Sequence, residues 1–514
     1  MTNLPVRPDW YTRERGCARL LSGFCRFTGR SRDQGRPYAA AVELHLRVDG
    51  RGDRTRQVYQ QLRAAIADGL LRPGETVPSS RELARRLGLA RNTVTLAYDR
   101  LTAEGFLRSR VGAGTYVCAE GLSPVSRPPA DSPLRPRPLW DGIDGGPDMS
   151  AIAAEFDFRA GIPDARRFPF ATWRALSSEQ LRSAAVGRGA HVGAAGVPAL
   201  RAAIARHVGV SRGVSADAED VLVTSGSQQA IDLVARVLLA PGDVVAVENP
   251  GYPPPRNAFR ALGCRVVGVP VDAEGLVVDA LPDGARLVYV SPSQQFPLGM
   301  VMSLRRRRAL LDWAERVDAA IVEDDYDSEF RFGGRPVEPL HRLDTSGRVL
   351  YVGSFSKVLL PTLRLGFVIA PPPLHAALHK AKHVADWHTS VPLQNTAAAF
   401  IEQGHLGRHI RRMRGVYTDR HLAMLRELSG PLSAHLEPIP SVAGLHVAAR
   451  LRTPVDGTDV AVAARVEQRG VALQPLSRFR MAGTATAPGF LLGYGAIDVA
   501  DIPEGLRRLR ACLE

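Results

Sequence analysis

Short apolar runs rich in β-branched residues alternate with helical patterns over residues 155–514, and this alternation constrains the fold most strongly. Apart from a polar residue at one end of some of them, the runs are continuously apolar, which is typical of parallel strands buried on both faces. The segments between them are long enough for the crossover helices that parallel strands require. The clearest runs are Val221–Thr224, Val244–Val247, Arg265–Val269, Leu287–Val290, Ala320–Glu323 and Val349–Val352. The pattern predicts an α/β domain with a largely parallel sheet and ligands at strand ends.

The overall composition limits the class of protein. A chain of 514 residues predicts two or three domains, and a hydrophobic content of 45% supports a large core. No run of 18 or more apolar residues appears, which argues against a membrane span and favours a cytoplasmic protein. The cysteines are odd in number, scattered and without metal-ligand spacing, which predicts reduced thiols. They are Cys17, Cys25, Cys118, Cys264 and Cys512.

The net charge of +14 is concentrated at one end of the chain. Residues 1–118 contain 21 arginines, no lysine and 11 acids, a net charge of +10, so the rest of the chain carries only +4. A basic end on a near-neutral body favours a module that binds a polyanion. A solvated basic tail is the alternative, and it explains residues 1–40 better than the patterned segment after them.

Three helical patterns follow one another in that segment. Val58, Leu62 and Ile66 recur every four residues and predict the first helix. Ser79 and Glu82 have the spacing of a capping box, which predicts the start of the second. The third begins at Arg91-Asn-Thr and would bury its apolar face while its polar residues point outward.

Two short strands around a glycine-rich tip complete a predicted winged helix-turn-helix domain at residues 41–118. In this fold the third helix enters the major groove of double-stranded DNA and the wing lies on the neighbouring backbone. Arg91 and Asn92 are candidates for reading base edges. The other candidate DNA contacts are Ser80, Thr93, Thr95, Arg108 and Arg110. A generic three-helix scaffold with a solvated face is the alternative.

Two further segments show no periodic pattern. Residues 119–150 are rich in proline, serine and glycine, which predicts a semi-rigid linker. Residues 1–40 are rich in arginine, and they are interpreted as a disordered arm or as the product of an upstream mis-start of translation.

Only three of the 66 basic residues are lysines: Lys357, Lys380 and Lys382. Arginine serves wherever a charge is needed, but it cannot lose its proton and form a Schiff base with an aldehyde. Lys357 lies in Ser354-Phe-Ser-Lys and is followed by Arg364, which makes it the candidate for covalent chemistry. The other two lysines have no such neighbours and are predicted to be ordinary surface residues.

Two turns at strand ends suit a phosphate group. The turn Ser225-Gly-Ser-Gln-Gln229 follows a strand and opens a helix, so its small residues expose backbone donors at a helix N-terminus. After another strand, Ser354, Ser356 and Arg364 offer hydroxyls and a guanidinium fork. Each turn alone also has an ordinary structural explanation.

The other strand ends suit a planar ring. Asp324 can hold a heteroaromatic nitrogen protonated, Tyr326 can hydrogen-bond a ring oxygen, and Tyr252 can stack on the ring. Acids that merely cap a strand or pair with arginines are the alternative. Together with a phosphate seat and the amine of Lys357, the set describes pyridoxal 5′-phosphate.

The motifs of both halves resemble known families. Residues 53–118 resemble the GntR winged-helix family, and residues 155–510 resemble the fold type I aminotransferase superfamily, most specifically in segment 323–366. Together they resemble the MocR family of transcriptional regulators. The resemblance implies a pyridoxal-phosphate domain at residues 151–514 and a head-to-tail homodimer. The motifs of the first half are Pro78-Ser-Ser-Arg-Glu-Leu-Ala, Arg91-Asn-Thr-Val, Tyr98-Asp-Arg-Leu and Gly112-Ala-Gly-Thr.

Carried over residue by residue, the resemblance implies a role for each site residue. Lys357 would be the Schiff-base lysine, Asp324 the partner of the pyridine nitrogen and Tyr326 the donor to the ring hydroxyl, and these three would be the catalytic groups. Tyr252 would be the stacking aromatic. The phosphate site would consist of Ser227, Gln228, Ser354, Ser356 and Arg364.

Some positions depart from the superfamily's pattern. His191 stands where a tyrosine often reaches the cofactor phosphate from the partner subunit. Leu491 stands where many aminotransferases place the arginine that clamps the substrate carboxylate, and Arg478 or Arg480 would have to supply that clamp. The missing arginine favours a sensor over an enzyme.

The leading functional hypothesis is a DNA-binding transcriptional regulator. Its aminotransferase-like domain would bind pyridoxal phosphate and sense an amine, an amino acid or the cofactor itself. An active aminotransferase with a DNA-binding head is the main alternative, and a cofactor-free dimerisation scaffold is the third.

Overall fold

The computed structural model describes residues 46, 48, 52–110, 114–118, 134–145, 154–182, 189–333, 338–452, 458–481 and 487–514. They fall into two compact units that divide between Arg135 and Pro136. The predicted arm and most of the predicted linker lie outside the described residues. Among the described residues, no helix is both long and apolar enough to cross a membrane.

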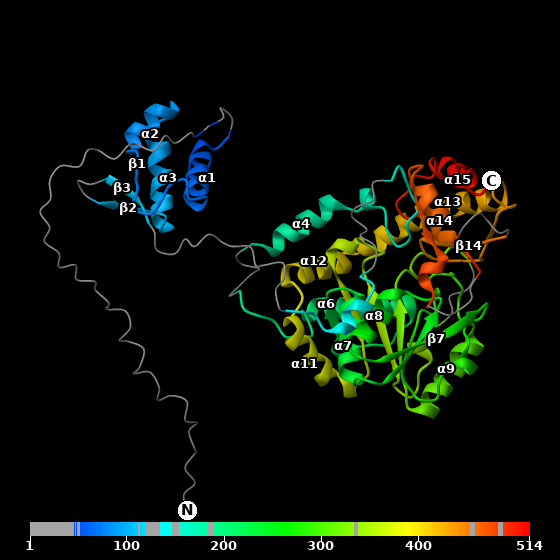
Figure 1. Ribbon diagram of the computed structural model, residues 1–514. Coiled ribbons are helices and arrows are strands. Elements are labelled where there is room, and N and C mark those ends of the chain that lie inside the picture. Colours follow the sequence, from blue (N-terminus) through cyan, green and yellow to red (C-terminus); the bar gives the residue numbers. More distant parts are fainter. Residues whose placement is uncertain are drawn as a thin grey trace, which may run out of the picture. The chain divides into compact units, whose positions relative to one another are not determined.

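The first unit is a three-helix domain with a small antiparallel sheet in the order β1-β3-β2 (Figure 1). Val58, Leu62, Val94, Ala97 and Leu101 are fully buried and hold the helices together, as the helical periodicity predicts. The elements are α1 (Arg54–Ala67), β1 (Thr76–Val77), α2 (Ser80–Leu87), α3 (Arg91–Ala103), β2 (Leu107–Arg110) and β3 (Gly114–Val117).

The start of α2 shows half of the predicted capping box. The backbone N–H of Glu82 donates to Ser79 Oγ at 3.2 Å. The Glu82 carboxylate instead accepts a hydrogen bond from Arg86 Nε at 3.0 Å. The helix ends at Gly88, whose left-handed backbone (φ 63°) favours glycine.

The second unit is built on an eight-stranded mixed sheet in the order β5-β12-β11-β10-β9-β6-β7-β8. The pairs from β11 through β10, β9 and β6 to β7 are parallel, which confirms the predicted α/β architecture. The strands are β5 (Val221–Thr224), β6 (Val244–Asn249), β7 (Arg265–Asp272), β8 (Gly275–Leu276), β9 (Ala285–Val290), β10 (Ala320–Asp325), β11 (Val349–Ser354) and β12 (Gly366–Ile369).

Helices cover both faces of this sheet, as Figure 1 shows for α7 and α9. Successive residues of β6 point to opposite faces: Val245 and Val247 pack in the core under α7, whereas Ala246 packs in the core under α9. The helices of this part are α4 (Phe170–Gln180), α6 (Pro198–Arg212), α7 (Ser227–Leu238), α8 (Pro253–Ala261), α9 (Leu304–Val317), α10 (Leu340–Leu343), α11 (His375–Asp386) and α12 (Val391–Glu402).

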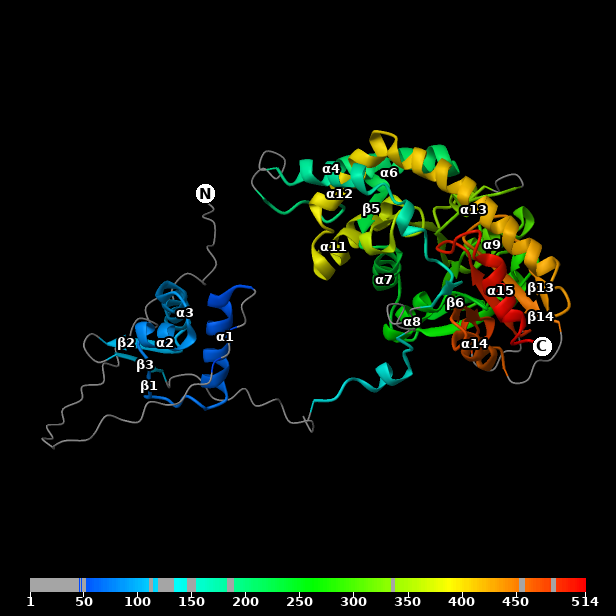
Figure 2. The same cartoon turned by 90° about the horizontal axis from the view of Figure 1, so that it is seen from above.

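A smaller four-stranded antiparallel sheet, in the order β13-β14-β17-β16, follows the long helix α13. Figure 2 shows α13 running from the neighbourhood of α12 to that of β13. The elements are α13 (His405–Ser429), β13 (Leu436–Pro438), β14 (His446–Leu451), α14 (Asp459–Glu467), β16 (Gln474–Pro475), β17 (Gly489–Gly493) and α15 (Ile502–Arg510). The pair β4 (Phe156–Asp157) and β15 (Val471–Ala472) ties the start of the unit to this part.

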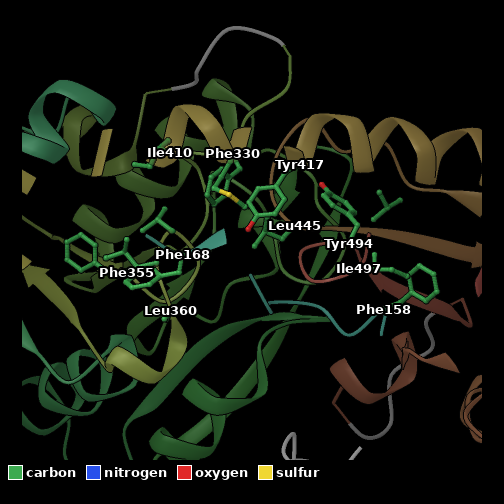
Figure 3. Close-up of a cluster of buried hydrophobic side chains, with 14 of the residues drawn as sticks. Phe158, Phe168, Phe330, Phe355, Leu360, Ile410, Tyr417, Leu445, Tyr494 and Ile497 are labelled. Atoms are coloured by element: carbon green, nitrogen blue, oxygen red, sulfur yellow. The ribbon is translucent and has the colours of Figure 1, made fainter. Parts of the chain in front are cut away.

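A cluster of buried aromatic and aliphatic side chains joins the two sheets (Figure 3). Phe330 and Tyr417 meet edge to face with their ring centroids 4.8 Å apart. Phe355 and Leu360 belong to the same core and flank Lys357 in sequence. The packed core therefore fixes the loop that carries the candidate nucleophile.

The thiols that the structure describes carry no disulfide. Cys118, Cys264 and Cys512 are free, and Cys264 is buried. Cys17 and Cys25 lie outside the described residues.

Candidate cofactor site and DNA-binding surface

Lys357 lies just beyond the end of β11, and its amine is held in place by the backbone. Lys357 Nζ donates to the carbonyl oxygen of Gly161 at 2.7 Å. A Cβ at Gly161 would lie 2.6 Å from that nitrogen, so a larger residue there would displace the amine. Burial lowers the pKa of Lys357, while Asp327 and Asp324 oppose the shift. A lowered pKa raises the fraction of uncharged amine, the form that attacks a carbonyl.

Asp324, the penultimate residue of β10, is a buried carboxylate with one oxygen in use. The Tyr289 hydroxyl donates to Asp324 Oδ2. The other oxygen, Oδ1, is buried and has no hydrogen-bond partner among the described residues. Burial raises the pKa of Asp324 to about 6. A buried acceptor left unpaired costs free energy, so the site fits a ligand that brings its own N–H donor, such as a pyridinium ring.

Aromatic side chains lie near Asp324, which acts electrostatically on Tyr252 and Tyr326. The rings of Tyr252 and Tyr326 both meet Phe296 edge to face, at centroid distances of 5.3 and 6.2 Å. The Tyr326 hydroxyl donates to the carbonyl oxygen of Gln294 at 3.0 Å. In this arrangement the Tyr326 oxygen is free to accept a hydrogen bond, whereas the sequence predicts a donor to a ring hydroxyl.

The two predicted phosphate turns meet because β12 lies between their strands. Gly366 of β12 pairs with Thr224 on one side and with Ser354 on the other. The Gly366 backbone is packed so closely that a Cβ added there would lie only 2.9 Å from the carbonyl carbon of Gly226 and 2.9 Å from the carbonyl oxygen of Gly353. The sheet therefore brings the start of α7 against the loop after β11.

The groups in these turns suit a phosphate. Arg364 Nη2 donates to the Ser225 carbonyl at 3.1 Å and would lie 2.8 Å from a Cβ at Gly226 (φ 87°). Ser354 Oγ accepts from the Ser356 N–H at 3.1 Å. Ser227 opens α7, where the first N–H groups of a helix lack intrahelical partners.

Gln228 is the exception among the predicted phosphate ligands. Its side-chain Nε2 donates to the Pro254 carbonyl at 3.3 Å, so the side chain is turned towards α8. The backbone N–H of Gln228, in the first turn of α7, is the group that could bind an anion.

The sequence does not predict two residues that contact the site directly but lie far from it along the chain. Tyr289 lies on β9, 35 residues before its partner Asp324 on the neighbouring strand β10, and Gly161 lies 196 residues before Lys357. Nothing in the local pattern around either residue signals the contact. The sequence predicts Ser225 only as part of a small-residue turn, whereas in the structure its hydroxyl lies 3.3 Å from Thr389 Oγ1.

The positions that depart from the aminotransferase pattern have local partners. Leu491 of β17 is fully buried in an apolar core with Leu476 and Phe479. Arg478 is exposed, and the Arg480 carbonyl accepts from Arg256 Nη1 at 3.4 Å. The position of Leu491 therefore offers an apolar wall in place of a cation.

His191 has contacts within its own chain. Its Nδ1 lies 3.1 Å from His388 Nε2, and its ring centroid lies 4.4 Å from that of Trp387. The residue is exposed.

The predicted DNA-binding residues lie on α2, α3 and the wing. Arg91 and Asn92 are exposed at the start of α3, and Arg108 and Arg110 are exposed on β2. Thr95 Oγ1 donates to the carbonyl oxygen four residues earlier at 3.1 Å, so its proton is already used. Ser80 and Thr93 are half-buried at the first turns of their helices. Residues 111–113, at the predicted tip, lie outside the described residues.

These geometries define a winged-helix protein with an aminotransferase-like second unit. The family model for bacterial regulatory proteins of the gntR family matches residues 54–117. The model for aminotransferases of class I and II matches residues 161–491. Pyrococcus horikoshii kynurenine aminotransferase, solved as a crystal structure, is similar with a TM-score of 0.65 and 30% identity over 71% of this chain and 91% of that one.

Curated relatives share both units. The "Probable rhizopine catabolism regulatory protein MocR" of Rhizobium meliloti is 37% identical over 463 residues, 89% of this chain and 93% of its own. The "HTH-type transcriptional regulator TauR" of Rhodobacter capsulatus is 35% identical over 91% of this chain and 98% of its own. The chain belongs to the MocR-type transcriptional regulators, in which a GntR-type head precedes an aminotransferase-like domain.

Proposed function

We propose that this regulator binds pyridoxal 5′-phosphate through Lys357 and uses it to sense a small amine, an amino acid or the cofactor itself. The observation that carries the proposal is the buried Asp324 Oδ1, which has no hydrogen-bond partner in the described part of the chain and lies at the sheet edge that also carries Lys357 and the phosphate turns. When bound, the cofactor supplies an aldehyde that condenses reversibly with primary amines and a ring that withdraws electrons.

Each site residue has a distinct task in this proposal. Asp324 would accept a hydrogen bond from the ring nitrogen and hold its proton, while Tyr289 keeps the carboxylate oriented. Tyr252 would stack on the ring, and Tyr326 would bond the ring hydroxyl. The phosphate would be held by Ser227, the Gln228 backbone, Ser354, Ser356 and Arg364.

The same proposal assigns the head to double-stranded operator DNA. The exposed Arg91 and Asn92 would read base edges, while Ser80, Thr93, Arg108 and Arg110 would contact phosphates. The chain would act as a head-to-tail homodimer in the cytoplasm, with one site at each subunit boundary. A ligand that favours one arrangement of the domains would shift operator binding only by its difference in affinity between the two arrangements.

A titration of the full chain with pyridoxal phosphate tests the cofactor assignment. An absorbance band of a protein Schiff base, distinct from that of the free cofactor and saturating at one cofactor per chain, is the expected result. A chain that acquires no such absorbance would instead be a cofactor-free scaffold, and the proposal would be wrong.

The relatives also keep an enzymatic alternative open. Aromatic-amino-acid aminotransferase 1 of Thermococcus litoralis is 32% identical over 68% of this chain and 85% of its own length. The apolar surroundings of Leu491 argue against a substrate carboxylate clamp at that position. Single-turnover spectroscopy with amino acids separates the two functions, because rapid conversion to the pyridoxamine form would identify a working aminotransferase and slow or absent conversion a sensor.

A further inference from the structure

Lys382 on α11 is fully buried, whereas Lys380 is exposed. The prediction that both are ordinary surface lysines is therefore wrong for Lys382. Its ammonium donates to Gln229 Oε1 at 2.8 Å, to both carboxylate oxygens of Asp386 at 2.5 and 2.7 Å, and to Thr389 Oγ1 at 3.3 Å. Gln229 Nε2 donates to Asp386 at 2.8 Å, which orients the amide with its oxygen towards the ammonium.

Two of the groups that Lys382 holds also hold the first phosphate turn. Gln229 Oε1 accepts from the Ser225 N–H at 2.8 Å, and Thr389 Oγ1 lies 3.3 Å from Ser225 Oγ. The remaining polar group of Ser225, its carbonyl oxygen, accepts from Arg364 at 3.1 Å. The turn is thus fixed on one side by Arg364 and on the other by a network centred on the buried ammonium.

We propose that Lys382 is a positioning residue for the phosphate seat. It fixes Gln229 and Thr389, which fix the Ser225 turn at the start of α7 in the shape that receives a phosphate monoester. The inference rests on the proposed cofactor function and deepens it. Lys382 itself does not touch the ligand, because its protons are used by the three side chains around it.

The choice of lysine supports this role. The chain uses arginine for 63 of its 66 cations, yet this buried position retains a lysine. A tetrahedral ammonium can donate to acceptors in three directions from one point, whereas a guanidinium is larger and donates within one plane. Lys382→Arg would keep the charge but could not satisfy Gln229, Asp386 and Thr389 together, so it should behave as a loss of function.

The test compares two ligands that differ only in the phosphate. Pyridoxal phosphate and pyridoxal are titrated into the full-length wild type, Lys382→Met and Lys380→Met, and binding is followed by visible absorbance. Lys382→Met should lower affinity for pyridoxal phosphate by about tenfold to hundredfold, as expected when a hydrogen-bonded charge that orders the turn is lost. Affinity for pyridoxal should stay unchanged. Lys380→Met, an exposed lysine on the same helix, should leave both affinities unchanged.

Two other outcomes would contradict the positioning role of Lys382. Equal losses for both ligands would show general destabilisation, and unchanged affinities would show that Lys382 does not act on the seat. If Lys382→Met does not fold, Thr389→Val removes one relay to Ser225 and should show the same selective loss for the phosphorylated ligand. Wild type that binds no pyridoxal phosphate would overturn the proposed function itself, whereas unaffected Lys382→Met with a binding wild type would overturn only the positioning role.

Discussion

In the winged-helix unit the residues assigned to DNA, such as Arg91, Asn92 and Arg108, are exposed, whereas in the aminotransferase-like unit Asp324 and Tyr289 are buried. DNA is a charged, hydrated polymer that is contacted at the protein surface, so a side chain that binds it needs only to be exposed. A cofactor ring must be desolvated and held at its nitrogen, so the protein keeps a buried acceptor ready. Substitutions of these exposed residues should therefore weaken DNA binding without changing the free energy of unfolding. Substitutions of the buried residues in the second unit should weaken cofactor binding and also change the free energy of unfolding and its dependence on pH.

The largest expected effect comes from Lys357→Ala. The variant should lack the absorbance band of a Schiff base with pyridoxal phosphate, because Lys357 supplies the amine in the proposed site, while its operator affinity matches that of cofactor-free wild type. Lys380→Ala is the matched control and should bind the cofactor normally. Absorbance retained by Lys357→Ala would show that another group is the nucleophile.

The next effect is on the pH dependence of stability. Burial raises the pKa of Asp324 to about 6, above the ordinary value near 4. Because the folded protein holds this proton more tightly than the unfolded chain, the stabilising contribution is full below about pH 4 and is lost as the pH rises through 6. The Asp324→Asn variant has no carboxyl group at this position that can titrate, so it serves as the reference.

Chemical denaturation of the cofactor-free proteins at several pH values measures the difference. The free energy of unfolding of wild type, relative to Asp324→Asn, should fall by about 2 kcal/mol between pH 4 and pH 7, since at pH 4 the unfolded carboxyl is itself about half ionised. A difference that stays constant over this range would contradict the assigned burial of the carboxylate.

Arg91→Ala should weaken discrimination between operator and random DNA by about 1–3 kcal/mol if the guanidinium reads a guanine edge. The thermal stability of the protein should hardly change, because the residue is exposed. Binding assays with both DNAs at one salt concentration give the answer. Equal losses on the two DNAs would make Arg91 a phosphate contact.

The smallest expected effect is that of Thr95→Val. The Thr95 hydroxyl already donates to a backbone carbonyl within α3, so its removal should change operator affinity by less than about 0.5 kcal/mol. A larger loss would show that this hydroxyl turns towards DNA in the complex.

Much of the fold could be predicted because the relevant signals are local. The central strands of the large sheet are mostly apolar, and the polar residues Ser225, Asp324 and Ser354 stand at or just after the ends of their strands. The parts that escaped prediction depend on distant packing. Tyr289 bonds a residue on a neighbouring strand, and Lys382 is buried only because α11 packs on α7. Nothing in the sequence around Lys382 distinguishes it from the exposed Lys380.

The central claim is that cofactor bound at Lys357 controls operator binding. Operator affinity of the full-length wild type and of Lys357→Ala is measured with and without pyridoxal phosphate, in the presence and absence of candidate amines. The account predicts that cofactor or amine shifts the affinity of the wild type and leaves that of Lys357→Ala unchanged. Wild-type affinity that is indifferent to cofactor and to every amine would contradict it.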